Sequence, residues 1–340
     1  MKRHQSQNNK QKLGQYYTTQ AITLLDKYIP YFKGKDVIDP FAGNCDLLDL
    51  AKEHDCSVLG YDLDPIRAET IRRNTLLDPP DFTKKFLLTN PPYLCSNKNK
   101  DKTVYEKWKQ NDLYKCHIAS FVGQAKEGIL IVPSNFLSES SSRCRSLFFS
   151  KYKILECDYY SYPVFKDATT GVCIFYFQES TDNKSFPCRI HYNPNNIIET
   201  DCLLCPEYNW LTGKEFFDYI NVEEPGFKRW TGKESGFLTS MIVGLLDYGK
   251  HKQGLSYNRG NPIICKEKAF TTYQLVSPFK MSKTLQKDIV EIFNTKMEYF
   301  RDKYHGMFLS NYMGANQKIY SRSYIHRLIN RIHFDLTSEK

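Results

Sequence analysis

The sequence lacks any long apolar run. No stretch approaches the ~18 consecutive apolar residues that a membrane-spanning helix needs, and the mean hydropathy is −0.54. The basic start at residues 1–6 is also not followed by the apolar segment of a secretory signal. We therefore expect neither a membrane protein nor a secreted one, and we predict an intracellular location.

Internal repeats and low-complexity tracts are missing as well. The 340 residues are 41% hydrophobic and 25% charged, which is the composition of an ordinary globular chain. This excludes collagen-like and disordered classes. The length predicts one or two domains.

A disulfide framework is not indicated, because the eleven cysteines are an odd number and are spread singly along the chain. Only Cys202 and Cys205 have the spacing of metal ligands, and Cys188 and His191 could complete a zinc set. The alternative is that these cysteines are small buried side chains, which the two intervening leucines favour. We predict thiols in a reducing compartment and no metal site.

Acidic residues are scarce at both ends of the chain. Residues 1–25 contain none, and residues 251–340 hold 15 Lys and Arg against 7 Asp and Glu, which is +8 of the net +9. Clustered cations of this kind bind phosphates, although a solvated surface has the same composition. The C-terminal part is therefore a candidate nucleic-acid contact.

In the first half, β-branched apolar runs alternate with helix-like stretches, which predicts a parallel sheet with crossover helices. After about residue 180 the segments become short and are interrupted by Pro and Gly, so we place a domain boundary at 185/186. The predicted domains are residues 1–185 and 186–340. The predicted strands are residues 37–39, 57–62, 86–89, 128–133, 153–157 and 172–177, the last two closing the sheet's edge, and the predicted helices are residues 65–74 and 112–125.

The first predicted strand ends in a glycine-containing turn, residues 39–46. Such a turn lets the backbone approach a ligand, and the carboxylate of Asp39 could hold a cationic amine. Asp62 ends the second strand 19 residues after Gly43, where nucleotide-binding folds place the acid that accepts ribose hydroxyls. The alternative is that Asp62 or Asp64 caps the following helix.

The third strand is followed by Asn90-Pro91-Pro92-Tyr93. The two prolines fix the backbone and remove two donors, so the Asn90 amide oxygen and the Pro91 carbonyl can accept both hydrogens of a planar amino group. The ring of Tyr93 could stack on a base. A plain tight turn is the alternative reading, but the position at a strand's carboxyl end favours a site.

With these motifs in this order, the chain resembles an S-adenosylmethionine-dependent, adenine-specific DNA methyltransferase of the gamma class over about residues 13–177. The resemblance implies an α/β fold, with a Rossmann-like class I methyltransferase sheet carrying helices on both faces. It also implies a smaller C-terminal α+β target-recognition domain after the catalytic domain.

The resemblance also assigns roles to residues. The expected catalytic residues, which receive the target base, are Asn90, Pro91, Pro92, Tyr93 and, as a second stacking ring, Phe165. The expected contacts of S-adenosylmethionine are Tyr16, Thr18, Asp39, Phe41, Ala42, Gly43, Asp62, Leu63, Asn74 and Asn90.

Three positions depart from the family pattern. Thr19 stands where a proline is usual, and Cys45 stands where a second glycine is usual. We expect the turn to tolerate Cys45 if its φ stays negative. Asn74 replaces a carboxylate that contacts the cofactor's adenine, so it can accept that hydrogen bond only without charge assistance.

The implied reaction is direct methyl transfer to the exocyclic amino group of an adenine that is flipped out of duplex DNA. The implied partners are double-stranded DNA and a restriction endonuclease that acts on the same site, and a monomer suffices for one strand at a time. Candidate contacts of the DNA backbone are residues 98–102, Arg143 and Arg145, and C-terminal Arg322, Arg327 and Arg331, with Tyr320 and Tyr324 interleaved.

Two other function classes stay open on the sequence. Methyltransferases that act on protein glutamine amides or on RNA adenine need the same planar-nitrogen loop. The N-terminal motif Gln15-Tyr16-Tyr17-Thr18, which resembles that of the DNA methyltransferase family, and the basic C-terminal part favour DNA. A decayed DNA-binding module is suggested by Cys45 and Asn74, whereas the intact Asn-Pro-Pro-Tyr loop speaks against decay.

Overall fold

A computed structural model describes most of the chain, in two compact units. The first unit ends at Trp210 and the second begins at Leu211. None of the helices in the described ranges is both long enough and apolar enough to cross a bilayer. Three predicted site residues, Tyr16, Thr18 and Phe165, lie outside the described residues. The described residues are 21–139, 142–162, 164, 171–180, 182, 184–222, 226–244, 254–260, 272–305 and 322–338.

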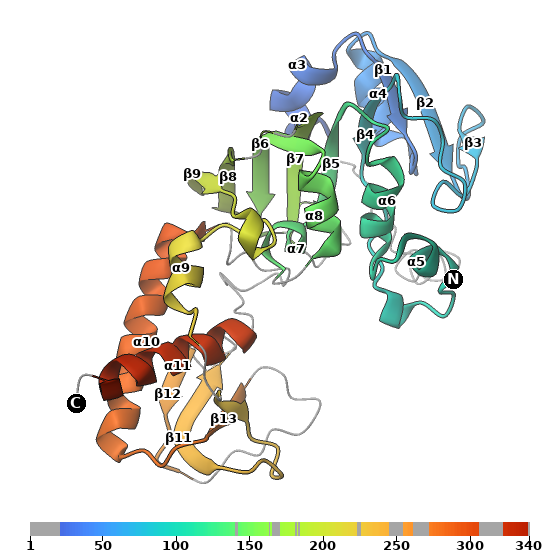
Figure 1. Ribbon diagram of the computed structural model, residues 1–340. Coiled ribbons are helices and arrows are strands. Elements are labelled where there is room, and N and C mark those ends of the chain that lie inside the picture. The colour runs from blue at the N-terminus through green and yellow to red at the C-terminus, as the bar shows by residue number, and fades with distance from the viewer. Residues whose placement is uncertain are drawn as a thin grey trace, which may run out of the picture. The chain divides into compact units, whose positions relative to one another are not determined.

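The first unit is built on a nine-stranded sheet in the order β3-β2-β1-β4-β5-β7-β6-β8-β9 (Figure 1). Neighbours from β3 to β5 are parallel, and β7 runs antiparallel to both β5 and β6. The carboxyl ends of β1, β2 and β4 therefore meet at one edge. The strands are β1 Asp36–Asp39, β2 Ser57–Asp62, β3 Ile71–Arg72, β4 Phe86–Thr89, β5 Glu127–Pro133, β6 Tyr152–Tyr160, β7 Val172–Glu179, β8 Ser185–Asn193 and β9 Asn196–Leu203.

Helices cover both faces of this sheet. Tyr176 and Phe177 are successive residues of β7 and so point to opposite faces. Tyr31 stacks on Tyr176 with 4.1 Å between ring centroids, and Phe121 stacks on Phe177 at 5.5 Å. The arrangement confirms the predicted Rossmann-like class I fold. The helices are α2 Ala21–Leu25, η1 Asp26–Tyr28, α3 Ile29–Phe32, α4 Asp46–Glu53, η2 Ser96–Lys98, α5 Thr103–Trp108, α6 Leu113–Phe121, α7 Asn135–Ser138, α8 Arg143–Phe149 and η3 Pro206–Tyr208.

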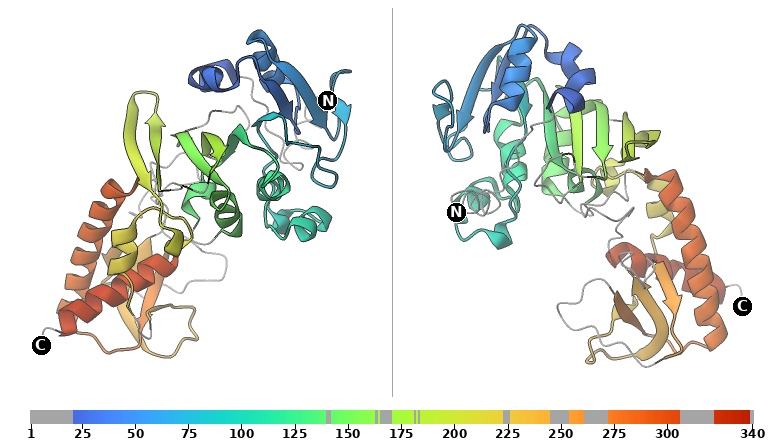
Figure 2. Two further views of the ribbon diagram at one scale, coloured as in Figure 1. Left: turned by 45° about the horizontal axis from the view of Figure 1, so that its top comes forward. Right: turned by 180° about the vertical axis from the view of Figure 1, so that it is seen from behind.

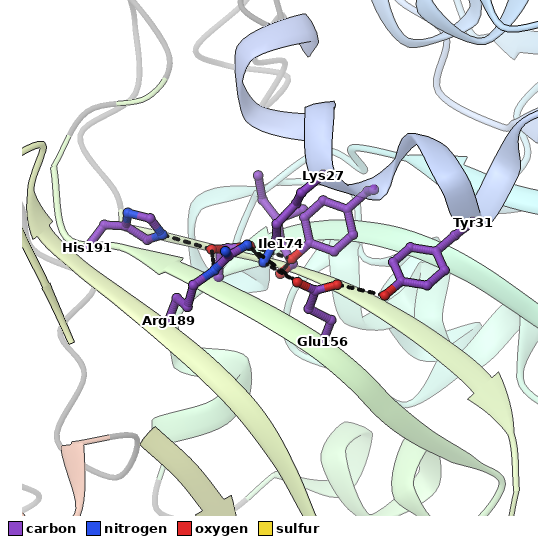
Figure 3. Close-up of polar contacts among 8 residues, drawn as sticks. Lys27, Tyr31, Glu156, Ile174, Arg189 and His191 are labelled. Carbon is purple, nitrogen blue, oxygen red and sulfur yellow. Dashed lines mark hydrogen bonds and ion pairs between the residues drawn. The ribbon is translucent and has the colours of Figure 1, made fainter. Parts of the chain in front are cut away.

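A buried carboxylate ties the N-terminal helices to the sheet. Asp158 on β6 is 1% exposed and accepts hydrogen bonds from the Tyr28 hydroxyl at 2.7 Å and from His191 Nε2 at 2.8 Å. Lys27 and Arg189 form ion pairs with the same carboxylate. Figure 3 shows Lys27 reaching the sheet beside Arg189 and His191. The network thus joins η1 to β6 and β8.

The predicted helix over residues 65–74 is wrong. Ile66 and Ile71 were expected to point inward, but their side chains are 61% and 47% exposed. The backbone instead becomes extended at β3, where Ile71 pairs with Tyr61 of β2. The strand pairing competes with the helix, and no apolar surface covers the two isoleucines. Since no helix follows Asp62, neither it nor Asp64 acts as the cap considered above.

The predicted strands over residues 153–157 and 172–177 are present but do not form the sheet's edge. β8 pairs in parallel with β6, and β9 pairs antiparallel with β8, so the sheet continues to Leu203. The compact unit therefore ends at Trp210 rather than near residue 185. The Pro and Gly residues after 180 mark turns between paired strands as well as a boundary.

The second unit is an α+β structure, as predicted, with a four-stranded antiparallel sheet in the order β10-β13-β11-β12. Figure 2 shows the long helix α10 beside this sheet. The side chain of Tyr324 is 7% exposed and packs edge-on against Phe216 and Phe217, so it belongs to the core and not to a DNA-contacting surface. The elements are α9 Lys214–Tyr219, β10 Lys228–Arg229, β11 Phe237–Gly244, β12 Gly254–Tyr257, β13 Thr272–Ser277, α10 Lys283–Lys303 and α11 Arg322–Ser338.

Candidate functional site

Asp39 ends β1 and is held between two strands. Its Oδ1 accepts the Phe41 N–H at 3.0 Å and the Thr89 hydroxyl at 2.6 Å, and the residue is 1% exposed. Burial raises the pKa of Asp39 to about 7, because desolvation disfavours the carboxylate more than these two hydrogen bonds stabilise it. A cationic amine placed beside it would restore its full charge.

Asp62 ends β2 and organises two backbone segments. Its Oδ2 accepts the Gly43 N–H at 2.9 Å, and its Oδ1 accepts the Asp64 N–H at 2.8 Å. Each carboxylate oxygen has a second lone pair available for a ligand hydroxyl. Asp62 therefore fixes the turn after β1 and presents acceptors at the same place.

The turn packs closely against β2 at Gly60. A Cβ atom at Gly60 would lie 2.5 Å from Leu48 Cδ1 and 3.3 Å from Ala42 Cβ. The Ala42 N–H donates to the Tyr61 carbonyl at 2.8 Å. This close approach brings the turn of β1 to the end of β2.

Cys45 does not keep the negative φ that we expected. Its φ is +70°, in the left-handed region, which costs a non-glycine residue about 1 to 2 kcal/mol. The residue is 1% exposed, and its Sγ lies 3.2 Å from the Thr70 hydroxyl oxygen. The turn thus has the geometry that glycine would favour, and the packing of the buried thiol offsets part of the strain.

Asp39 and Asp62 line a cavity of about 350 Å³ at the carboxyl edge of the sheet. The cavity brings together residues from all three described motifs. Pro91 and Tyr93 do not line it. The predicted cofactor contacts of Tyr16 and Thr18 and the predicted stacking of Phe165 lie outside the described residues. The predicted residues that line it are Asp39, Phe41, Ala42, Gly43, Asp62, Leu63, Asn74, Asn90 and Pro92.

Sequence reasoning missed the apolar wall of this cavity. The wall comes from Leu76 and from residues 94–113, which pack on each other: Trp108 Nε1 donates to the Leu76 carbonyl at 2.7 Å. The only sequence signal was the position of this segment directly after the Asn-Pro-Pro-Tyr loop. The apolar lining residues not predicted are Leu47, Leu76, Leu94, Val104 and Leu113, and the polar ones are Asn44, Asp46, Arg73, Thr75, Asn99 and Asp101.

Asp112 joins the end of the segment over residues 94–113 to its beginning. The Asp112 carboxylate accepts the Cys95 thiol at 2.9 Å and the Leu94 N–H at 3.2 Å. Burial raises the pKa of Asp112, and it raises the pKa of the Cys95 thiol to about 12. Cys95 therefore stays a neutral donor near neutral pH, and the loop is tied down beside the Asn-Pro-Pro-Tyr motif.

Asn90 lies at the end of β4, is 9% exposed and lines the cavity. The Tyr93 hydroxyl donates to Asn90 Oδ1, and it also lies 2.8 Å from the Ile131 carbonyl, its second acceptor. The Tyr93 ring packs edge-on against Tyr114, with 6.3 Å between centroids. In this structure Asn90 lines the cavity, whereas the ring of Tyr93 packs against Tyr114.

Chemically, the cavity joins three kinds of surface. Asp39 offers a carboxylate for a cation, Asp62 offers acceptors for hydroxyls, and the wall around Leu76 offers an apolar slot for a flat ring. A volume of about 350 Å³ is in the range of small-molecule sites. This combination of two carboxylates and an apolar wall fits a ligand that carries an ammonium group, a sugar and an aromatic base.

One predicted DNA contact is wrong. Arg145 is fully buried, and its guanidinium donates to the Asn209 carbonyl at 2.7 Å and to Asn209 Oδ1 at 2.8 Å. Its Nη1 also donates to the Phe136 carbonyl at 3.2 Å. Arg145 therefore holds α8 to the segment at Asn209, while Arg143 on the same helix is exposed.

The candidate zinc ligands have other roles. His191 contacts Asp158 through Nε2, and Cys188, Cys202 and Cys205 are buried thiols. Across the described ranges, no group of three or more Cys, His, Asp or Glu side chains is placed to hold a metal ion. The arrangement agrees with the reading of these cysteines as core side chains.

Comparison with known families gives one match on the sequence. Residues 83–165, which include the Asn-Pro-Pro-Tyr loop, match the Eco57I restriction-modification methylase family. A search of curated proteins found no match.

Several solved structures are similar in fold. One is a modification subunit of a putative type I restriction enzyme from Vibrio vulnificus YJ016, with 13% identity, a TM-score of 0.46 and coverage of 58% of each chain. The type IIG restriction endonuclease BpuSI has 11% identity and a TM-score of 0.45, covering 64% of this chain and 36% of that one. A type I methyltransferase subunit from Streptococcus thermophilus has 15% identity and a TM-score of 0.43, covering 56% and 51%. The chain thus spans about a third to three fifths of these proteins.

Proposed function

We propose that this protein is a site-specific DNA methyltransferase, which transfers a methyl group from S-adenosylmethionine to the exocyclic amino group of an adenine flipped out of duplex DNA. The observation that carries the proposal is that Asn90 lines the same cavity as Asp39 and Asp62. The match of residues 83–165 to a restriction-modification methylase family supports the same reaction class.

The residues of the cavity fit the cofactor in three parts. Asp39 would hold the ammonium group of the methionine, and Asp62 would accept the ribose hydroxyls. The apolar wall of Leu76, Leu94 and Val104 would enclose the adenine ring, with Asn74 at its edge. When bound, the cofactor supplies a methyl group on a sulfonium, so the reaction needs no nucleophilic side chain.

Asn90 and Pro91 would act on the target base. Two fixed oxygen acceptors can take both hydrogens of the adenine amino group, which localises the nitrogen lone pair toward the methyl donor. The same acceptors stabilise the positive charge that develops on that nitrogen. Asn90 and Pro91 thereby orient the amino group, and its excess proton leaves after transfer.

A base in duplex DNA must leave the helix to reach this cavity, at a cost of a few kcal/mol. Stacking between Tyr93 and Phe165 would offset part of that cost, by roughly 1 to 3 kcal/mol for each ring. In the structure Tyr93 packs against Tyr114, so its ring would have to rotate or the base would have to approach it from the rim. Phe165 stays a prediction from the sequence.

We further propose that the protein acts on DNA as a monomer, with the second unit as the target-recognition domain. Residues 251–340 carry +8 of the net +9, which suits contact with a polyanion. A restriction endonuclease that cleaves the same site would be the functional partner.

A transfer assay tests the proposal. The protein is incubated with S-adenosyl-[methyl-³H]methionine and unmethylated genomic DNA, and the DNA is digested to nucleosides and chromatographed. We expect label in N6-methyl-2′-deoxyadenosine. Parallel reactions with total RNA and with a protein extract measure the two other acceptor classes, and label found only there would contradict the proposal.

A further inference from the structure

A second cavity lies in the first unit, beside the cofactor cavity. Its volume is about 510 Å³. Its charged lining consists of four cations and one carboxylate, so the cavity is electropositive. The charged residues that line it are Lys102, Lys109, Lys115, Arg143 and Glu106.

The two cavities are separated by one wall, the segment that follows the Asn-Pro-Pro-Tyr loop. Leu94 and Val104 line the first cavity, and the adjacent Ser96 and Tyr105 line the second. The Tyr105 hydroxyl donates to the Leu94 carbonyl at 3.0 Å. A ligand in the second cavity would therefore lie against the segment that directly follows the loop of Asn90.

The cations of this cavity differ in their partners. Lys102 is exposed and donates to the carbonyls of Ser96 and Asn99. Lys109 and Arg143 are exposed, and in the described part of the chain neither is engaged in an ion pair or a side-chain hydrogen bond. Lys115 is 3% exposed, with its Nζ 2.9 Å from Asn111 Oδ1. An anion entering the cavity would be within reach of the two exposed cations, and Lys115 adds positive charge at the wall.

We propose that this basic cavity binds phosphodiester groups of the DNA strand that carries the target base. The inference rests on the proposed function, since a flipped nucleotide keeps its backbone at the rim of the catalytic pocket. Lys and Arg side chains are the usual phosphate contacts. The cavity would hold the strand in register while Asn90 receives the base.

The double variant Lys109→Gln/Arg143→Gln tests the proposal. Both side chains are exposed, so the fold should be unaffected. The matched control is Lys33→Gln/Lys151→Gln, which removes two exposed cations that precede β1 and β6, at the opposite edge of the sheet. Because phosphate contacts do not depend on sequence, a duplex of arbitrary sequence serves as the probe, and its affinity is measured by fluorescence anisotropy across a series of salt concentrations.

We expect the plot of log affinity against log salt concentration to lose about 0.9 of slope for each phosphate contact removed, about 2 in total. The control variant should keep the wild-type slope, and both variants should keep the wild-type affinity for S-adenosylmethionine. Equal slopes for the double variant and the wild type would overturn the proposal. Binding of inorganic phosphate with no change in DNA slope would assign the cavity to a free anion, which also overturns it.

The outcome is separable from the proposed function. A wild-type protein that methylates adenine in DNA, with an unchanged slope in the double variant, would leave the methyltransferase assignment standing and reject only the phosphate site. A reduced slope together with no methyl transfer by the wild type would support the phosphate site and reject the proposed reaction.

Discussion

The Tyr93 hydroxyl donates a hydrogen bond to Asn90 Oδ1, the oxygen that we propose receives the target amino group. An amide oxygen has two lone pairs and can accept a second donor. The hydroxyl has one proton and the Ile131 carbonyl as its other acceptor, at 2.8 Å. The hydroxyl can therefore stay on Asn90 or turn to Ile131 when a base binds.

If Tyr93 stacks on the target base as we propose, its ring is needed for activity and its hydroxyl is dispensable. We expect Tyr93→Phe to keep kcat within a few-fold of wild type, because the ring remains and Asn90 Oδ1 loses only the hydrogen bond from the Tyr93 hydroxyl. Tyr93→Ala should raise KM for DNA strongly, since it removes a stacking surface worth roughly 1 to 3 kcal/mol. Steady-state kinetics on DNA checks both, and a Phe variant as inactive as the Ala variant would show that the hydroxyl is needed.

Cofactor affinity should depend on pH through Asp39. Burial raises the pKa of Asp39 to about 7, so the free protein carries a neutral acid below that pH. The affinity for S-adenosylmethionine should then fall by up to about tenfold for each pH unit below 7 and level off above it. Isothermal titration between pH 5.5 and 8 measures this. Asp39→Asn should bind weakly with a flat profile, and an equally steep profile in that variant would place the titrating group elsewhere.

The affinity for S-adenosylmethionine should fall when Asp62 loses one of its two carboxylate oxygens. In Asp62→Asn, one of the two backbone N–H groups, of Gly43 or of Asp64, would face an amide NH₂, which costs roughly 1 to 3 kcal/mol. We expect the affinity for S-adenosylmethionine to fall by about tenfold or more. Asp64→Asn is the matched control, because its side chain is 83% exposed and pairs with the exposed Arg72. Equal affinities for the two variants would contradict the role of Asp62.

Asp158 should contribute to stability in a pH-dependent manner. Burial by itself would raise the pKa of Asp158, but hydrogen bonds from His191, Lys27 and Tyr28 outweigh it and lower the pKa to about 2. The stabilisation is thus present above about pH 4 and is lost as the pH falls through about 2.

Replacement of the same carboxylate tests its energetic weight. We expect Asp158→Asn to lower the free energy of unfolding in urea at pH 7 by about 2 to 4 kcal/mol, because it removes the buried charge that pairs with Lys27 and Arg189, whose other ion pairs are to the more exposed Glu156. Asp49→Asn, which breaks the exposed pair with Arg67, should cost less than about 1 kcal/mol. Similar losses in the two variants would mean that the network around Asp158 does not anchor η1.

The parts of the site that the sequence predicts are those fixed by local rules. Asp39, Asp62 and Asn90 each end a buried strand, and parallel strands bring their carboxyl ends to one edge. The structure places these three residues around one cavity. The apolar wall from Leu94 to Leu113 could not be predicted in the same way, because it depends on how an irregular segment folds back onto Leu76.

The errors have the same origin. Nothing in the local sequence around Pro65 indicates that Tyr61 pairs with Ile71. The local pattern therefore predicts a helix over residues 65–74. Arg145 looks like a surface cation until Asn209, 64 residues later, supplies its acceptors. The conformation of residues 65–74 and the burial of Arg145 depend on contacts with other segments of the chain. Such contacts cannot be predicted from the local pattern of a single sequence.

The identity of the methylated atom tests the central claim most directly. Wild-type protein and Asn90→Ala are each incubated with tritiated S-adenosylmethionine and unmethylated DNA, and cofactor affinity is measured for both by isothermal titration. The account predicts label in N6-methyl-2′-deoxyadenosine for the wild type, and none for Asn90→Ala at near-normal cofactor affinity. Full transfer by Asn90→Ala, or wild-type label on cytosine instead of adenine, would contradict it.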